Sequence, residues 1–227
     1  MGFIKNIFSP KPRLSGAQTH AAESDLKPKK PYIFLESEEL TIGVFRPQLT
    51  STETVKLDTV LRKLEALRIA IGQYEIDGLT TETGIFPSSL DDISAFEKNN
   101  NLTLPEDFKA LLEEAGYDIF PYHKLTPSPD VMGLPLGDGS DEIPIQPDWY
   151  VNAKKKVIEI SDFGCGIYFI MCLFEPEHGN IWILDGANTG TASPVVPENE
   201  GINRVRFLDW YNYWLDAALA EIDRDLQ

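Results

Sequence analysis

Apolar residues recur with a helical period in the first strongly patterned part of the chain, from Glu53 to Gly72. They fall on one side of a helix drawn through this segment, and charged side chains such as Arg62 and Glu65 fall largely on the other. The apolar set is Leu57, Val60, Leu61, Leu64, Leu67 and Ile71. The pattern predicts an amphipathic helix that Ser51 or Thr52 can cap.

A second helix is predicted to start at Ser88, which is a natural N-cap residue. Asp91 follows three residues later and completes a capping-box pattern. Leu90, Ile93 and Phe96 recur at three-residue spacing and are expected to form the apolar face of this helix.

A third helix is predicted after a run of asparagines, with Pro105 at its first position, where a missing N–H is tolerated. Its buried stripe is expected to consist of Phe108, Leu111, Leu112 and Ala115. Gly116 is placed to close it.

The second half of the chain has the pattern of a sheet. An alternating segment begins at Val157, and Ile167–Phe174 is apolar on both faces, as in a central strand that is covered on both sides. A short turn should lead to an antiparallel neighbour at 180–185, and 193–196 is a last extended piece. A helix from about Phe207 to Ile222 ends the pattern, and its aromatic residues are interpreted as core, not as a stacking platform. The order of these elements predicts an α+β fold.

Four of these segments together resemble the SUKH superfamily, which includes fungal regulators of cell-wall glucan synthesis and many bacterial immunity proteins. The first matching set is Ile93, Phe96, Glu97, Leu104, Pro105, Asp107, Phe108, Lys109, Leu111, Leu112 and Gly116. SDFGCGIYFI at 161–170 resembles the glycine-bearing central strand of the family, GNIWILD at 179–185 its G-x-I-W strand, and 207–219 its final aromatic helix. The resemblance reaches from roughly Thr52 to Leu219. It implies a single domain with a mostly antiparallel sheet, packed with N-terminal helices and a C-terminal aromatic helix.

The chain is expected to divide into three parts. Residues 1–31 are basic and poor in large apolar side chains after Phe8, so we expect a disordered tail. Residues 32–51 are β-prone and are expected to be an extended N-terminal extension, and 52–227 should form the SUKH-like domain. Within that domain, the proline-rich stretch 118–152 is expected to be a long, partly ordered loop.

Charge narrows the possible partners. The net charge is −16, but residues 1–31 hold six basic side chains against two acidic ones, so the remainder holds 14 against 34. Residues 32–227 are therefore strongly negative and should repel phosphate backbones, which argues against nucleic-acid binding. The same charge favours a basic protein partner. The alternative is that the acidity only supports solubility.

The start of the chain and its two cysteines both favour a location in the cytoplasm. The first residues lack an apolar segment of secretory length and fail the myristoylation pattern, so we expect a cytoplasmic protein without a membrane anchor. Cys165 and Cys172 would lie on one strand and face opposite sides, which makes an intrastrand disulfide unfavourable.

We expect no catalytic, cofactor or metal site. Gly164-Cys165-Gly166 lacks the third glycine of a dinucleotide fingerprint and is interpreted as a glycine bulge. Asp138, Asp141 and Glu142 lack the spacing of an EF-hand. Charged residues beside aromatic ones are typical of interfaces. The candidate partner-binding residues are therefore Asp138, Asp141, Glu142, Trp149 and Tyr150.

The resemblance implies a non-enzymatic immunity protein that binds and neutralises a cognate toxin, and the acidity suggests a basic, nuclease-type toxin. The alternative is an intracellular regulator or scaffold like the fungal members of the family. A small hydrolase that uses Cys165 or the Asp138 cluster is a third hypothesis.

Overall fold

The computed structural model describes the chain in several stretches. They are residues 30–35, 46–47, 49, 55–77, 79–81, 86–121, 131–134, 143–144, 155–164, 166–186, 191–197 and 204–227. The helices are α2 (Leu57–Gln73), α3 (Leu90–Asn100), α4 (Glu106–Glu114) and α6 (Phe207–Asp225). The main strands are β7 (Lys155–Gly164), β8 (Ile167–Cys172), β9 (Ile181–Asp185) and β10 (Thr191–Pro194). The short strands are β1 (Tyr32–Phe34), β2 (Glu75–Asp77), β3 (Leu79–Thr81), β4 (Ile119–Pro121), β5 (Val131–Leu134) and β6 (Ile143–Pro144).

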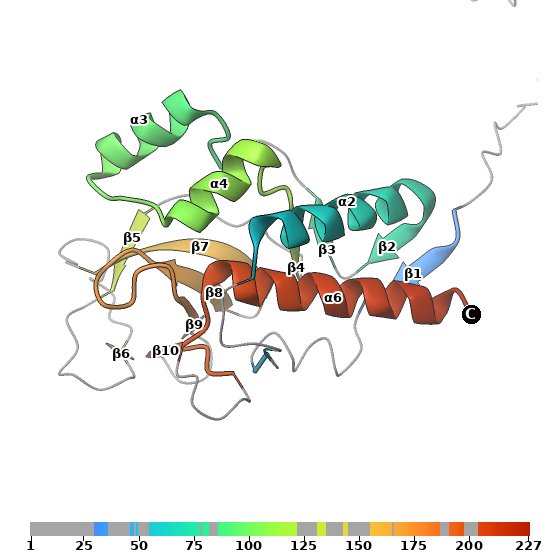
Figure 1. Cartoon of the computed structure of the whole chain (residues 1–227). Helices are drawn as coiled ribbons and strands as arrows, with labels where there is room; N and C mark the ends of the chain where they lie inside the picture. Colours follow the sequence, from blue (N-terminus) through green and yellow to red (C-terminus); the bar gives the residue numbers. More distant parts are fainter. Residues whose placement is uncertain are drawn as a thin grey trace, which may run out of the picture.

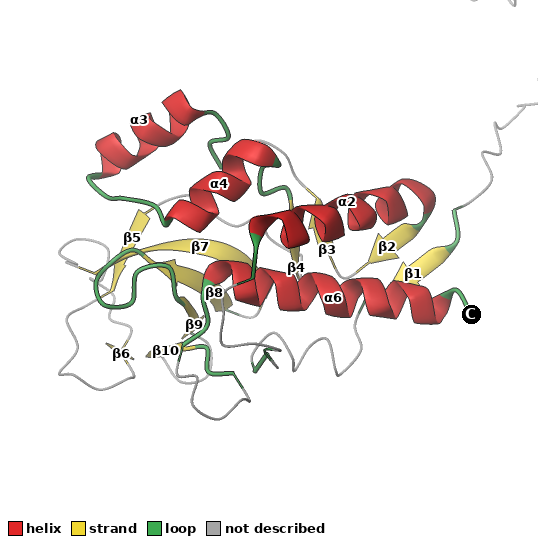
Figure 2. Cartoon of the chain, in the orientation of Figure 1, coloured by secondary structure: helices red, strands yellow, loops and turns green. Residues whose placement is uncertain are grey.

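Six strands form one antiparallel sheet in the order β5-β7-β8-β9-β10-β6. Strands β3 and β4 form a separate antiparallel pair, and β1 and β2 form a parallel one. Helices α4 and α6 pack on one face of the main sheet, α2 lies along α6, and α3 lies outermost, beyond α4 (Figure 1). Helices and strands are thus segregated into layers (Figure 2), which confirms the predicted α+β fold and its mostly antiparallel sheet.

Strand β8 is buried on both faces, as its sequence predicts. Phe169 and Met171 face the helices and belong to the main core. Ile170 and Cys172 point to the other face, where they pack with Trp182 and their neighbours in a second apolar cluster. Alternation along one strand therefore supplies both clusters, and β8 lies between β7 and β9 as a central strand should.

Aromatic side chains of α6 fill the main core. Phe207, Trp210, Tyr211 and Trp214 are all fully buried. The ring centroids of Phe108 and Phe207 lie 4.7 Å apart in an edge-to-face contact. The Tyr211 hydroxyl donates a hydrogen bond to the carbonyl oxygen of Ile119 over 2.8 Å, so the buried ring keeps a polar partner. The core interpretation of this helix is confirmed.

Two helix starts differ from the sequence-based expectation. Helix α2 begins at Leu57, later than predicted, and no side chain of the preceding residue caps it. The Val55 N–H, two residues before the helix, donates to the Asp209 carboxylate at 2.8 Å, which ties the chain before α2 to α6. Helix α3 is capped by Ser89, whose Oγ accepts the Asp92 N–H, and the prediction of Ser88 was wrong by one residue.

Three further sequence predictions, on the two ends of α4 and on the apolar face of α3, can be compared with the structure. Pro105 lies at the N-cap position of α4, one residue before the helix instead of inside it. Gly116 has a φ of +74°, and its N–H donates to the carbonyl oxygens of Leu111 and Leu112, which confirms its closing role. Leu90 was expected on the buried face of α3 but is 64% exposed, because the first turn of this helix extends beyond the core.

The glycine pair of the central segment forms a hairpin turn. Strand β7 ends at Gly164 and β8 starts at Ile167, and Gly164 and Gly166 both adopt positive φ. The described residues of 161–170 therefore belong to two paired strands and not to one. Cys165 lies outside the described residues, so the expectation that it shares a strand with Cys172 stays a prediction. In the proline-rich stretch 118–152, the described residues form β4, β5 and β6.

The core also includes part of the segment that was expected to be an extension. Ile33 and Leu35 are almost completely buried and belong to the same cluster as the helices. Among the described residues, no helix has the length and apolar character needed to cross a membrane.

Candidate protein-binding surface

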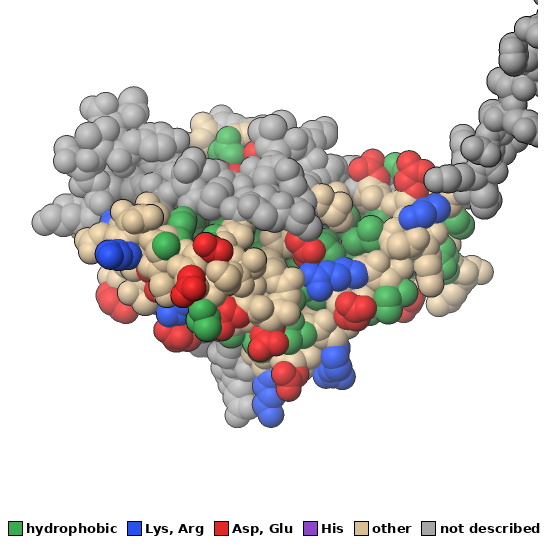
Figure 3. Space-filling model, turned by 90° about the horizontal axis from the view of Figure 1, so that it is seen from above, with side chains coloured by type: hydrophobic (Ala, Val, Ile, Leu, Met, Phe, Trp, Pro, Cys, Tyr) green, Lys and Arg blue, Asp and Glu red, His purple; other side chains and the backbone are tan. Residues whose placement is uncertain are grey.

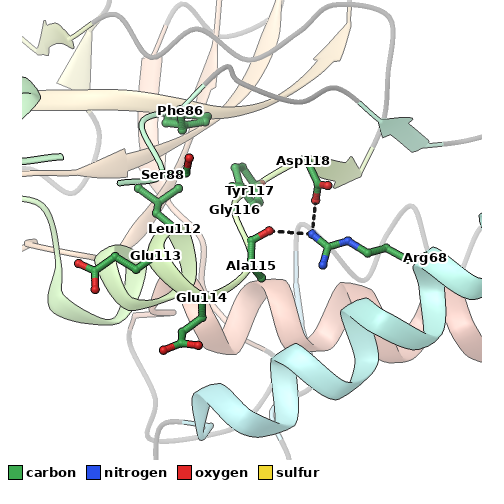
Figure 4. A pocket seen from close by; sticks show the side chains of 10 residues that line it. All are labelled: Arg68, Phe86, Ser88, Leu112, Glu113, Glu114, Ala115, Gly116, Tyr117 and Asp118. Carbon is green, nitrogen blue, oxygen red and sulfur yellow. Dashed lines mark hydrogen bonds and ion pairs between the residues drawn. The ribbon is translucent and has the colours of Figure 1, made fainter. Parts of the chain in front are cut away.

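The segment before α3, the end of α4 and a side chain of α2 surround an open hollow of about 400 Å³. Phe86 and Ser88 contribute from the segment before α3, and 112–118 contribute from the end of α4 and the residues after it. Arg68 reaches in from α2 (Figure 4). The hollow thus lies where α3 begins and α4 ends.

Gly116 sets the geometry of this end of α4. Its left-handed backbone turns the chain sharply, which a residue with a Cβ adopts only with strain. The next residue, Tyr117, points into the core and donates its hydroxyl to the Ile160 carbonyl oxygen at 2.9 Å. Burial raises the pKa of this hydroxyl, with the nearby Tyr211 as a smaller cause, so Tyr117 stays protonated and acts as a structural donor. Asp118 follows at the wall of the hollow.

Arg68 is the one basic residue that lines the hollow, and its charge is already used. Its Nη2 donates to the carbonyl oxygen of Ala115 and to the carboxylate of Asp118, both at 2.8 Å. The guanidinium therefore holds the end of α4 against α2 (Figure 4). Because both partners belong to the chain itself, Arg68 does not make the hollow a site for an anion.

The last turn of α4 carries acidic side chains that have no basic partner among the described residues. Glu113 and Glu114 are exposed, line the hollow, and form no ion pair with another described residue (Figure 4). The carbonyl end of a helix is the negative end of its dipole, and no basic residue lies in this turn. Two carboxylates here weaken the helix slightly, so local stability does not explain them.

More carboxylates lie in the first turn of α3, which follows Ser88 of the hollow's lining by a few residues. Asp91 is exposed and forms no ion pair with a described residue, and Asp92 accepts a hydrogen bond from Ser89 Oγ at 2.6 Å. We call Asp91, Asp92, Glu113 and Glu114 the acidic rim. Figure 3 shows this face from above, with carboxylate side chains spread over its described part among fewer basic ones.

Charges at the opposite end of the α3–α4 hairpin are paired. Lys109 Nζ lies 2.7 Å from a Glu106 oxygen and 3.4 Å from a Glu97 oxygen. The hydrogen bond that Lys109 donates to Glu106 raises the pKa of Lys109, with Glu97 adding to the effect against the opposing influence of burial. Glu97 and Glu106 thus have a basic partner in Lys109, whereas the carboxylates of the acidic rim have none among the described residues.

A second polar cluster supports the G-x-I-W strand. Glu177 accepts hydrogen bonds from Arg204, Asn180 and the Trp182 Nε1–H, at 2.8 to 3.1 Å. Burial alone would raise the pKa of Glu177, but these donors outweigh it and hold the pKa below its ordinary value. The cluster fixes the Trp182 ring on the sheet. Its polar atoms are engaged with one another, so it serves structure.

The structure does not describe the residues that the sequence analysis proposed for partner binding. Asp138, Asp141, Glu142, Trp149 and Tyr150 lie outside the described residues, as does Cys165. The described residues contain no group of three or more His, Cys, Asp or Glu side chains that could hold a metal. Sequence reasoning missed the acidic rim, although the Glu113-Glu114 pair in a last helical turn without lysine or arginine was a visible signal.

Comparison with known proteins agrees with the motif-based resemblance. The family model described as SMI1/KNR4 family (SUKH-1) matches residues 87–200, which is half of the chain. The match begins at the segment before α3 and ends just after β10, so it includes the main strands and the hollow's lining apart from Arg68 and Phe86. No curated protein and no solved structure matches the chain. The chain is a member of the SMI1/KNR4 family, SUKH-1.

Proposed function

We propose that this protein acts by binding another protein, and that its partner is a basic toxin domain which it neutralises as an immunity protein. The observation that carries the proposal is the acidic rim, whose exposed carboxylates form no ion pair with any described residue. At the end of α4, Glu113 and Glu114 also gain nothing for the helix that bears them. Membership in the SUKH-1 family supports a binding role, and the net charge of −16 supports a basic partner.

The chemistry of the surface favours a protein over other ligands. Carboxylates repel the phosphates of nucleic acids, so an acidic surface fits the basic groove of a nuclease better than its substrate. An immunity protein of this kind would occupy the groove that the phosphates need. Charge complementarity also speeds encounter, which is the property an inhibitor of a toxin requires.

We infer that the proline-rich stretch supplies a second part of the interface. Asp138, Asp141 and Glu142 add negative charge, and Trp149 and Tyr150 add the aromatic side chains that often anchor interfaces. With the acidic rim they would provide both charge and apolar contact. We also infer that the protein acts in the cytoplasm and by binding alone, without catalysis.

The test is coproduction with a toxin. The candidate toxin is the C-terminal domain of the secreted protein encoded by the neighbouring reading frame, produced in cells that it kills. The natural chain should restore growth and copurify with the toxin domain. Absence of both would contradict the immunity role. Copurification with a host protein involved in cell-wall synthesis, without rescue, would support the regulator and scaffold alternative.

A matched pair of variants tests the surface. Glu113→Lys with Glu114→Lys should abolish or strongly weaken rescue, whereas Asp223→Lys with Asp225→Lys should leave it intact. Both pairs are exposed, and both lie in the last turn of a helix, where a lysine is electrostatically favourable. Misfolding therefore does not explain a difference between them. Equal rescue by both double variants would contradict the proposed surface.

A further inference from the structure

Helix α3 is held to the rest of the domain by few contacts. Of its residues only Ile93 is buried, and Phe96 is partly buried against the core. Leu90 in its first turn is largely exposed. The helix lies at the outside of the molecule, beyond α4 (Figure 1). It therefore contributes little buried apolar area to the domain.

The sequence of α3 gives it little stability of its own. The helix has 11 residues, and an isolated helix of this length is marginal in water. Its two aspartates, its serine and its asparagines are weak helix formers. The helix consequently depends on its caps and on its attachments to the body.

The main polar attachment is a lysine from the sheet. Lys156 of β7 donates from Nζ to the carbonyl oxygen of Asn100, and to that of Asn101 at 2.7 Å. These carbonyls end α3, so Lys156 caps the helix and places a positive charge at the negative end of its dipole. Glu97 adds a second attachment, because its carboxylate accepts the Leu104 N–H at 2.7 Å.

We propose that α3 opens as a unit while α4, α6 and the sheet stay folded, and that Lys156 is the latch that holds it closed. Opening breaks the two hydrogen bonds of Lys156 and exposes Ile93 and Phe96. It also moves Asp91 and Asp92 away from Glu113 and Glu114, because the first pair lies on α3 and the second on α4. The state of the latch thus sets the arrangement of the acidic rim, whatever partner that rim binds.

Amide hydrogen exchange of the full chain tests the opening. Amides in 93–100 should exchange much faster than those in α4 and α6, and their exchange should respond little to low denaturant, as local openings do. If the amides of α3 exchange as slowly as those of α4, with the same dependence on denaturant, α3 opens only when the whole domain unfolds and the proposal is wrong.

Lys156→Met tests the latch, since it keeps the length of the side chain and removes its donors. Exchange in 93–100 should become about tenfold faster or more, the effect of losing hydrogen bonds from a charged group. Exchange in α4 and α6 should not change. Lys63→Met is the matched control, because Lys63 also makes two polar contacts, to Asn212 at 2.7 Å and to Asp216 at 2.5 Å. It should leave the exchange of α3 unaltered.

Two results with the variants would overturn the role of Lys156. The first is exchange in α3 that is unchanged by Lys156→Met. The second is an equal acceleration of α3 and α4, which would make Lys156 a support of the whole domain. If Lys156→Met does not fold, the domain has lost more than a latch, and that outcome also contradicts the proposal.

Discussion

Gly179 shows how a single residue joins three parts of this fold. It has a φ of +84° in the turn between β8 and β9. Its N–H donates to the carbonyl oxygen of Cys172 at 2.8 Å, and its own carbonyl accepts the Phe207 N–H at the start of α6. A Cβ at this position would lie 3.4 Å from the ring of Pro105, at the start of α4. The G-x-I-W motif thus has a glycine at this position because the backbone is left-handed there and because Pro105 packs closely against it.

Gly179→Ala should therefore lower the free energy of unfolding by about 1–2 kcal/mol, the strain of a left-handed backbone on a residue with a Cβ. Gly72→Ala is the control, because Gly72 lies in the last turn of α2 with open space around it. That change should stabilise by up to about 1 kcal/mol. Chemical denaturation of the three proteins measures both. Equal effects of the two substitutions would show that the turn is described wrongly.

Glu177 makes stability depend on pH. Its pKa in the folded protein is below the ordinary value, so it stabilises the fold above the pKa of the unfolded chain, and this stabilisation is lost as pH falls through the folded pKa. Glu177→Gln should destabilise the protein at pH 7 by about 1–3 kcal/mol. The difference should shrink below about pH 4, where the natural side chain becomes protonated. A difference that is constant with pH would contradict the ionised cluster.

At the scale of elements, α3 and α4 differ in how they are held. Phe108 of α4 is fully buried and contacts Phe86, Tyr117 and Phe207 through edge-to-face ring pairs. Leu90 of α3 is mostly exposed, although the sequence pattern treats both as members of apolar faces. The period of a helix identifies the side that faces inward, but how far the core extends along the helix is a tertiary property.

Phe108→Ala should lower the free energy of unfolding by about 3–5 kcal/mol, because it empties core volume. Leu90→Ala should change it by less than about 0.5 kcal/mol, as is usual for exposed positions. Denaturant midpoints of the two variants give the comparison. A large loss from Leu90→Ala would mean that the first turn of α3 is packed against the body.

At this scale, the sequence could predict features that depend on neighbouring residues, but not those that depend on residues far apart in the chain. Periodicity and local turn chemistry predicted the helices, the closing role of Gly116 and the central position of β8. The doubled pairs Ser88-Ser89 and Asp91-Asp92 fit the same capping pattern at two registers, so the sequence could not choose between them. The contact of Asp209 before α2 and the contact of Lys156 at the end of α3 come from residues remote in sequence, and the acidic rim combines residues from two helices. These features required the tertiary structure.

At the scale of the whole molecule, the N-terminal segment divides at about residue 30. Ile33 and Leu35 are core residues, and Lys30 donates from its side chain to the carbonyl oxygen of Ile71 at the end of α2. Residues 1–29 carry few large apolar side chains after Phe8. We expect the boundary of the folded domain between these two parts.

Removal of 1–29 should leave the thermal midpoint nearly unchanged, whereas removal of 1–35 should lower it by many degrees, because it deletes two buried side chains and strand β1. Calorimetry of the two truncated proteins checks this. A large drop after the shorter truncation would mean that the first 29 residues stabilise the fold.

The central claim is that an acidic surface attracts a basic protein partner. Its most direct test is the association rate of the chain with the toxin domain, measured by stopped flow at about 50 mM and about 500 mM salt. The rate should fall about tenfold or more with salt, and Glu113→Lys with Glu114→Lys should lower it at low salt, because opposite charges steer the encounter. Association that is equally fast at both salt concentrations, and unaffected by the two substitutions, would contradict the claim.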